Sequence, residues 1–313
     1  MRDDWLRPLG STGLTVSAVC AGGSGIAGMP AVFGYDVTRQ EAVDLVLRVV
    51  DGPLTWIDTS NGYGDGESEL RIGRAIREYG GLPDGFLVAT KVDARGKDYS
   101  GARASVAESK ERLGLDDLPL VYLHDPELHD FDSIRDAVDT LMQLRADGEI
   151  GHVGLAGGNT AELGRYLDLG GFEVLLVHNR WSLVDHSAGD LIRRAAGDGM
   201  AVVNAAIYGG GILANPQGAT KYAYRAAPAA VLDAVAEMDK ACREFGTDLA
   251  TAALRHSVDS PGIAGTVVGI SKPARVDALL EAVATDLPDE LLNRLGNLLP
   301  QERYWVEGTK ETT

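Results

Sequence analysis

Strand-like and helix-like segments alternate along nearly the whole chain of 313 residues, and this alternation limits the possible folds more than any other feature. Short apolar runs predict strands, and each run is followed by a stretch with apolar residues at helical spacing. The predicted strands cover residues 16–21, 54–58, 86–91, 118–124, 150–155, 174–177, 201–206 and 263–268. The predicted helices cover residues 39–50, 67–79, 101–113, 133–147, 161–169, 187–196, 231–245 and 273–283.

Eight strand–helix repeats with short connections indicate a closed parallel sheet wrapped by helices, the (β/α)8 or TIM barrel of the α/β class. The competing fold, an open doubly wound sheet, calls for a GxGxxG fingerprint after the first strand, and the glycine-rich residues 22–25 do not fit it. We expect a single domain over residues 1–313, a common size for such a barrel. Residues 6–10 and 13–17 predict an N-terminal β-hairpin, and residues 289–299 predict a C-terminal helical extension.

Charge and cysteine content exclude several classes of partner. The formal net charge of −17 argues against nucleic acid and anionic membranes, because both require a positive surface. Cys20 and Cys242 lie far apart, as expected of reduced thiols in the cytoplasm, and no run approaches transmembrane length. Neither these cysteines nor the six histidines show the spacing of a metal site, so we expect no metal. The sequence predicts a soluble cytoplasmic protein and leaves its oligomeric state open.

Four reactive side chains fall at or just after the ends of neighbouring predicted strands. Asp58, Lys91 and His124 end the second, third and fourth strands, and Tyr63 lies on the glycine-flanked loop after the second. Taken alone, residues 58–69 also fit an ordinary turn in which Asp58 caps the next helix. In a barrel, however, the carboxyl ends of the strands meet at one mouth, where catalytic groups are usually found.

The chemistry of these four groups is specific. A free tyrosine has a pKa of about 10, too high for ready proton exchange near neutrality. An adjacent Lys91 ammonium is expected to lower the pKa of Tyr63, and Asp58 to hold that ammonium in place. His124 is suited to position an oxygen by a hydrogen bond. The matching reaction is proton transfer at an alcohol or carbonyl oxygen, coupled to hydride transfer, which requires a nicotinamide cofactor, NAD(H) or NADP(H).

The motifs that hold these residues resemble those of the aldo-keto reductase superfamily. They are Arg7-Pro8-Leu9-Gly10-Ser11-Thr12-Gly13-Leu14, the Asp58-Thr59, Tyr63-Gly64 and Ser68-Glu69 pairs, Thr90-Lys91, and Tyr122-Leu123-His124. In that family the Asp, Tyr, Lys and His at these positions form the catalytic tetrad. The resemblance therefore implies an NAD(P)-dependent oxidoreductase with Tyr63 as general acid or base.

A narrower resemblance concerns the substrate. Residues 122–127, 179–185 and 203–213 are similar to the aldose 1-dehydrogenase branch, which includes enzymes acting on L-fucose, L-galactose and pyridoxal. This similarity implies oxidation of the anomeric hydroxyl of a sugar. A reductase of other aldehydes or ketones is an equally open alternative, and a nicotinamide-binding regulatory subunit without turnover is a third.

The resemblance also implies where the cofactor binds. Asn159 and His178 stand near the positions of the family's carboxamide ligands, and Tyr208 is the candidate replacement for a stacking tyrosine where this chain has Ala205. Glycines allow close approach of the backbone to a pyrophosphate, and a helix N-terminus with basic residues attracts phosphate. The cofactor contacts predicted in this way are Asn159, His178, Tyr208, Gly210, Gly211, Ser271, Lys272 and Arg275. The basic residues favour NADP, although an ordinary solvated helix start would look the same.

Residues on the predicted mouth loops are candidates for a substrate pocket. They are Phe33, Asn61 and Trp181, each of which is equally consistent with loop packing. The long loop over residues 209–230 is of the kind that often acts as a lid.

Overall fold

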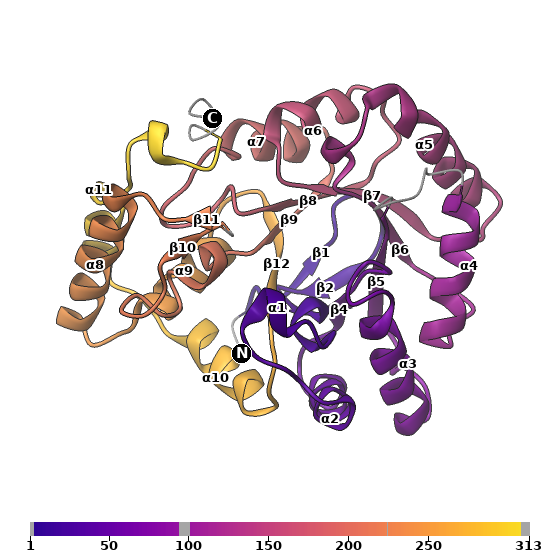
Figure 1. Ribbon diagram of the computed structural model, residues 1–313, viewed down its shortest axis with the longest axis horizontal. Coiled ribbons are helices and arrows are strands. Elements are labelled where there is room, and N and C mark those ends of the chain that lie inside the picture. The colour runs from indigo at the N-terminus through magenta and orange to yellow at the C-terminus, as the bar shows by residue number, and fades with distance from the viewer. Residues whose placement is uncertain (1–2, 94–100, 224, 308–313) are drawn as a thin grey trace.

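A closed parallel barrel forms the centre of the molecule. The structure is a computed structural model, and it describes residues 3–93, 101–223 and 225–307. Its eight strands hydrogen-bond in the order β12-β3-β4-β5-β6-β7-β8-β9 (Figure 1). They are β3 (Val19–Gly22), β4 (Trp56–Asp58), β5 (Leu87–Asp93), β6 (Leu120–His124), β7 (His152–Gly157), β8 (Val174–His178), β9 (Ala201–Ala205) and β12 (Ile263–Gly269). The predicted (β/α)8 barrel is confirmed.

Helices surround this barrel (Figure 1). They are α1 (Pro30–Phe33), α2 (Arg39–Val50), α3 (Glu67–Tyr79), α4 (Ala102–Leu113), α5 (Phe131–Ala146), α6 (Thr160–Leu167), α7 (Gly189–Gly197), α8 (Ala229–Glu244), α9 (Leu249–Val258), α10 (Ala274–Ala284) and α11 (Asp289–Asn297). Short 3₁₀ turns are η1 (Gly23–Ile26), η3 (Pro126–Leu128), η4 (Gly209–Gly211) and η5 (Glu302–Tyr304). Within the described residues, every helix falls short of the length and apolar character needed to cross a membrane.

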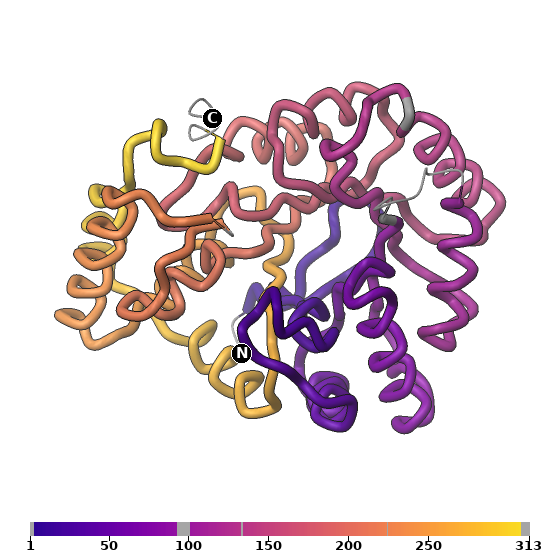
Figure 2. Tube along the Cα trace, in the orientation of Figure 1, coloured from indigo at the N-terminus to yellow at the C-terminus, as the bar shows by residue number. Residues whose placement is uncertain are grey.

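The N-terminal hairpin pairs β1 (Leu6–Pro8) with β2 (Thr15–Ser17), as predicted. Ala18 belongs to neither β2 nor β3, so the expected first strand is divided between these two strands. Figure 2 follows the chain from this indigo region to the orange β12, which lies beside it and closes the barrel through the β12–β3 pairing.

The connection between β9 and β12 differs most from the prediction. The expected long loop contains η4 and a small hairpin of β10 (Lys221–Tyr222) and β11 (Arg225–Ala226). The expected single helix is followed by a second one, α9, which begins where the Asp248 side chain accepts a hydrogen bond from the Thr251 backbone. A helix cap of this kind is a local signal that the apolar pattern alone does not reveal.

Alternate strand residues fill the inside of the barrel, and this alternation determines which strand-end side chains face the mouth. Trp56 of β4 and Tyr122 of β6 belong to one buried interior cluster. Residues two positions apart on a strand point to the same face, so Asp58 follows Trp56 and His124 follows Tyr122 on the interior side. Lys91 of β5 reaches the same space, where it bonds to Asp58.

Helices α3 and α4 approach each other closely at Gly73. A Cβ added there would lie 2.1 Å from the Arg112 carbonyl oxygen and 2.8 Å from the Leu113 backbone. We expect Gly73→Ala to lower the free energy of unfolding by about 1–3 kcal/mol, because the helices must separate. Gly164→Ala in α6 is the matched control, since its new Cβ would meet nothing nearer than 3.8 Å. Urea denaturation of Gly164→Ala should give an unchanged free energy of unfolding or one raised by up to about 1 kcal/mol. Equal losses of stability in the two variants would contradict the close approach of α3 and α4 at Gly73.

Candidate active site

Three side chains form a hydrogen-bonded chain inside the barrel mouth. The Lys91 ammonium donates to Asp58 Oδ1 at 2.5 Å, to the Thr59 carbonyl oxygen at 2.8 Å and to the Tyr63 hydroxyl oxygen at 3.2 Å. These bonds use all three of its donors. Lys91 is only 1% exposed and Asp58 3% exposed, so the ion pair is fully inside the protein.

His124 lies beside the phenol of Tyr63. Their ring centroids are 5.9 Å apart, and the rings meet edge to face at 82°. On its other sides, His124 Nδ1 lies 3.4 Å from Ser60 Oγ, and Nε2 lies 3.7 Å from Asp125 Oδ2. The structure therefore brings together all four of the side chains that the strand ends predicted.

The electrostatics of the site differ from the expectation. Burial raises the pKa of Tyr63 to about 12; Lys91 acts in the opposite direction but does not cancel this effect, and Asp58 adds to it. Burial on its own would lower the pKa of the Lys91 ammonium, but Asp58 and Tyr63 outweigh it and raise that pKa above its ordinary value. Lys91 thus lowers the Tyr63 pKa as expected, but desolvation of the phenolate exceeds this attraction, so the pKa as a whole lies above its ordinary value.

Comparison with known proteins identifies the family. The aldo/keto reductase family model matches residues 19–299. The chain belongs to this family. It is 28% identical to D-threo-aldose 1-dehydrogenase of Pseudomonas sp over 310 residues, which cover 89% of this chain and 92% of the relative. It is 30% identical to L-galactose dehydrogenase of Arabidopsis thaliana over 289 residues, which cover 89% and 88%.

A solved structure shares the fold. An aldo-keto reductase from Bacillus halodurans in its holo form superposes with a TM-score of 0.79, covering 97% of this chain and 99% of the other at 21% identity. The family assignment makes the present aldo-keto reductase an NAD(P)-dependent oxidoreductase, and the predicted similarity to aldose dehydrogenases is confirmed.

The end of β8 offers a polar group that fits the carboxamide of a nicotinamide. His178 has partners on both ring nitrogens, Asp125 at 3.2 Å and the Asn179 amide nitrogen at 3.3 Å. Asn159 caps α6 by accepting from the Glu162 backbone at 3.3 Å. Asn179 Oδ1, in contrast, is buried and has no partner among the described residues. A carboxamide NH₂ would satisfy this oxygen, which the sequence analysis did not single out.

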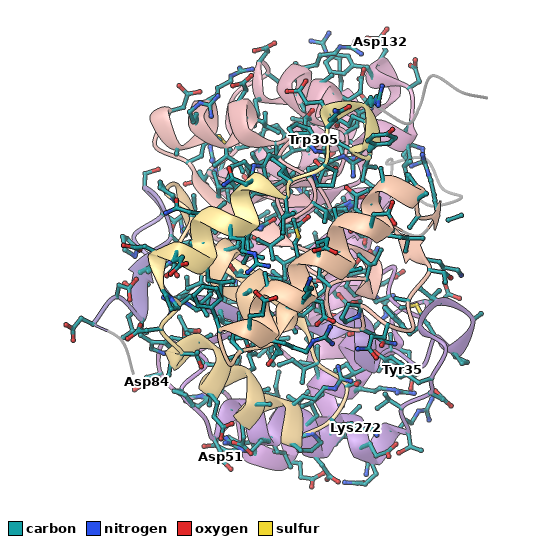
Figure 3. The ribbon with its side chains drawn as sticks, turned by 90° about the vertical axis from the view of Figure 1, so that its left-hand side faces the viewer. Tyr35, Asp51, Asp84, Asp132, Lys272 and Trp305 are labelled. Atoms are coloured by element: carbon teal, nitrogen blue, oxygen red, sulfur yellow. The ribbon has the colours of Figure 1, made fainter. Side chains whose placement is uncertain are left out.

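The phosphate side of a dinucleotide is matched by η4 and the start of α10. All three glycines of η4 have left-handed φ angles, of 58°, 78° and 102°, and nothing lies within 4 Å of a Cβ added to the last one. Ser271 is 8% exposed, and Lys272 and Arg275 are exposed at the surface; Figure 3 labels Lys272 in the lower part of the view. Burial raises the pKa of Tyr208 to about 12, while the nearby Arg275 guanidinium opposes this rise. These residues fit a phosphorylated cofactor.

Two of the predicted substrate contacts follow strands of the barrel: Phe33 ends the short helix α1 after β3, and Asn61 lies on the loop after β4. Phe33 stacks on Tyr35, with ring centroids 5.7 Å apart, and Figure 3 labels Tyr35 on the same side of the molecule as Lys272. The Asn61 side chain donates to Ser105 Oγ of α4 at 2.8 Å. Their contact with a substrate stays a prediction.

Trp181, the third predicted substrate contact, packs against neighbouring side chains, and its contact with a substrate also stays a prediction. Its ring stacks on His186 and His256, at centroid distances of 4.6 and 5.7 Å, and its Nε1 donates to Ser260 Oγ at 2.7 Å. The Asn204 amide also donates to the Trp181 carbonyl oxygen at 2.8 Å. The indole therefore packs against α9, which carries His256.

Proposed function

We propose that this aldo-keto reductase oxidises the anomeric hydroxyl of an aldose to a lactone, with NAD⁺ or NADP⁺ as hydride acceptor and Tyr63 as general base. The observation that carries the proposal is the bonded chain from Asp58 through Lys91 to Tyr63, with His124 beside the phenol. The aldose dehydrogenases among the relatives support a sugar as substrate.

Each residue has a defined part in this reaction. A nicotinamide held by Asn179 and the η4 glycines would supply the hydride chemistry, as acceptor in oxidation and as donor in reduction. The Tyr63 oxygen takes the proton of the sugar hydroxyl as the carbonyl forms, and returns it to the carbonyl oxygen in the reverse direction. Lys91 stabilises the phenolate, Asp58 holds Lys91, and His124 donates a hydrogen bond to the reacting oxygen.

We further propose that Lys272 and Arg275 favour NADP over NAD, because a ribose 2′-phosphate forms charge-assisted bonds with both. Replacing both residues by alanine is expected to weaken NADPH binding by roughly 10–100-fold, with a much smaller effect on NADH. Fluorescence titration with each nucleotide measures the two affinities. Arg303→Ala, which removes an exposed charge on η5, is the control. Equal losses for both nucleotides would contradict 2′-phosphate recognition.

The decisive experiment follows the absorbance of the reduced nicotinamide. L-fucose, L-galactose and D-arabinose are tested with both oxidised cofactors, and simple aldehydes with both reduced cofactors. Reduction of cofactor by sugars supports the aldose dehydrogenase. Turnover of aldehydes with all sugars inert makes the protein a general carbonyl reductase. Tight nucleotide binding without any turnover supports a regulatory subunit.

A further inference from the structure

The Glu307 carboxylate bridges two segments at the barrel mouth. Its Oε1 accepts a hydrogen bond from the Thr160 backbone N–H at 2.7 Å, and its Oε2 accepts one from the Thr160 hydroxyl, also at 2.7 Å. On the other side, Arg180 Nε lies 3.4 Å from Glu307 Oε1. Thr160 begins α6 after β7, and Arg180 follows β8. One side chain of the C-terminal segment therefore ties together the segments that follow two neighbouring strands.

Charge explains why a carboxylate fits this position. Arg180 is only 6% exposed, and a buried guanidinium without a nearby anion is costly. Thr160 presents a backbone N–H that has no partner within the helix, at the positive end of α6, where a carboxylate is stabilised by the helix dipole. Glu307 satisfies both groups at once. Its own side chain is 26% exposed, so the bridge lies at the boundary between the protein interior and solvent.

The two bridged segments carry the residues proposed to meet the carboxamide of a nicotinamide. Asn159 directly precedes Thr160, and Asn179, whose buried Oδ1 has no partner among the described residues, directly precedes Arg180. Asn179 has a φ of 58°, in the left-handed region, and such a conformation persists only where the surrounding structure holds it. Its backbone N–H donates to the Ala205 carbonyl oxygen at 3.2 Å. The bridge through Arg180 holds the other side of this turn.

The C-terminal segment has other anchors, so the bridge is not needed merely to keep it in place. The Val306 backbone N–H donates to Asp185 Oδ2 at 2.8 Å. Trp305, labelled in Figure 3, donates from its Nε1 to the Pro300 carbonyl oxygen at 2.9 Å. Loss of the Glu307 carboxylate should therefore free the segments after β7 and β8 while the C-terminal segment stays docked.

We propose that Glu307 is a positioning residue, which holds the segments after β7 and β8 at the spacing that the nicotinamide carboxamide requires. The inference rests on the cofactor placement of the proposed function and is independent of the sugar substrate. Without the bridge, Asn159 and Asn179 shift relative to each other, and ordering them again on binding costs affinity. The phosphates are matched by η4 and the start of α10, which follow other strands, so their binding is unaffected.

The test compares the binding of NADPH with that of 2′-phospho-ADP-ribose, which is the same nucleotide without the nicotinamide ring. Isothermal titration calorimetry gives both Kd values, and their ratio measures what the nicotinamide adds. Both ligands carry the same phosphates, so a general change in the charge of the protein cancels from this ratio. We expect the native protein to bind NADPH at least about tenfold more tightly than 2′-phospho-ADP-ribose.

Glu307→Ala should lower this ratio by roughly 3–10-fold, through weaker NADPH binding alone, because the bonds to Thr160 and the ion pair with Arg180 are lost together. Thr160→Val removes only the hydroxyl bond and should lower the ratio by about 2–3-fold. Glu302→Ala, the same loss of charge at an exposed position of η5, is the matched control and should keep the native ratio. The same changes are expected for NADH measured against ADP-ribose.

Other outcomes would overturn the positioning role. If Glu307→Ala weakened both ligands by the same factor, Glu307 would be a structural support of the mouth, and an unchanged ratio would remove its link to the cofactor. Equal native affinities for the two ligands would overturn both the role of Glu307 and the carboxamide placement. Turnover tests the proposed function separately. A protein that oxidises no sugar, but loses the nicotinamide contribution in Glu307→Ala, would refute aldose oxidation and support the role of Glu307.

Discussion

Tyr63→Phe is expected to lower kcat by about 10²–10⁴-fold in both directions, because it removes the only atom proposed to exchange the proton with substrate. Lys91 would keep its bonds to Asp58 and to the Thr59 carbonyl oxygen, at 2.5 and 2.8 Å, so the ion pair survives the change. The predicted nucleotide contacts follow β7, β8, β9 and β12, whereas Tyr63 lies on the loop after β4. Nucleotide affinity should therefore change little.

Two measurements separate this loss from a folding defect. Steady-state turnover of the best sugar or aldehyde gives kcat, and fluorescence titration gives the nucleotide Kd. Tyr79→Phe, which removes the hydroxyl of a 41% exposed tyrosine at the end of α3, is the control and should be fully active. A Tyr63→Phe enzyme with native kcat would refute the proton-transfer role.

The part of the site that the sequence predicts follows from two features: the barrel fold and the two-residue alternation of side chains along each strand. Once eight strand–helix repeats indicate a parallel barrel, the residue that ends each strand is near the mouth, and the two-residue alternation decides whether it faces inward. Asp58 and His124 meet both conditions, whereas β5 continues past Lys91 to Asp93 and only the inward alternation holds for Lys91. These are the side chains that the structure brings together with Tyr63.

Other features depend on contacts that no local pattern contains. Asp125 meets His178 across 53 residues, and neither stretch indicates the pairing. The direction of the Tyr63 pKa depends on how fully the folded protein excludes water from the phenol. The packing of Trp181 depends on bonds to Ser260 and Asn204, residues that lie far along the chain from it.

Lys91→Met is expected to remove at least about 99% of turnover, since the phenolate of Tyr63 loses its only cationic partner among the described residues. The pH dependence of the oxidation rate should also change, in a direction that the pKa of Tyr63 determines. Oxidation uses the deprotonated phenol, so its rate rises as the pH approaches the Tyr63 pKa. Lys91 is the group that lowers this pKa against burial, and its loss raises the pKa further. The rising limb of the oxidation profile should therefore move to higher pH.

The same substitution has a predictable effect on stability. Asp58 Oδ2 is buried without a partner among the described residues, and replacing the Lys91 ammonium by a thioether would leave Oδ1 without its cation as well. Leaving one member of a buried ion pair uncompensated costs about 3–5 kcal/mol. Urea denaturation of Lys91→Met measures this loss.

A double variant separates charge burial from catalysis. Asp58→Asn combined with Lys91→Met removes both charges, and should recover most of the lost stability because a buried pair stabilises little beyond its neutral replacement. Turnover should stay as low as in Lys91→Met, because the cation that stabilises the phenolate is still absent. If the double variant regained activity along with stability, Lys91 would act by holding the fold of the mouth. If Lys91→Met kept the native pH profile, the electrostatic coupling of Lys91 to Tyr63 would be wrong.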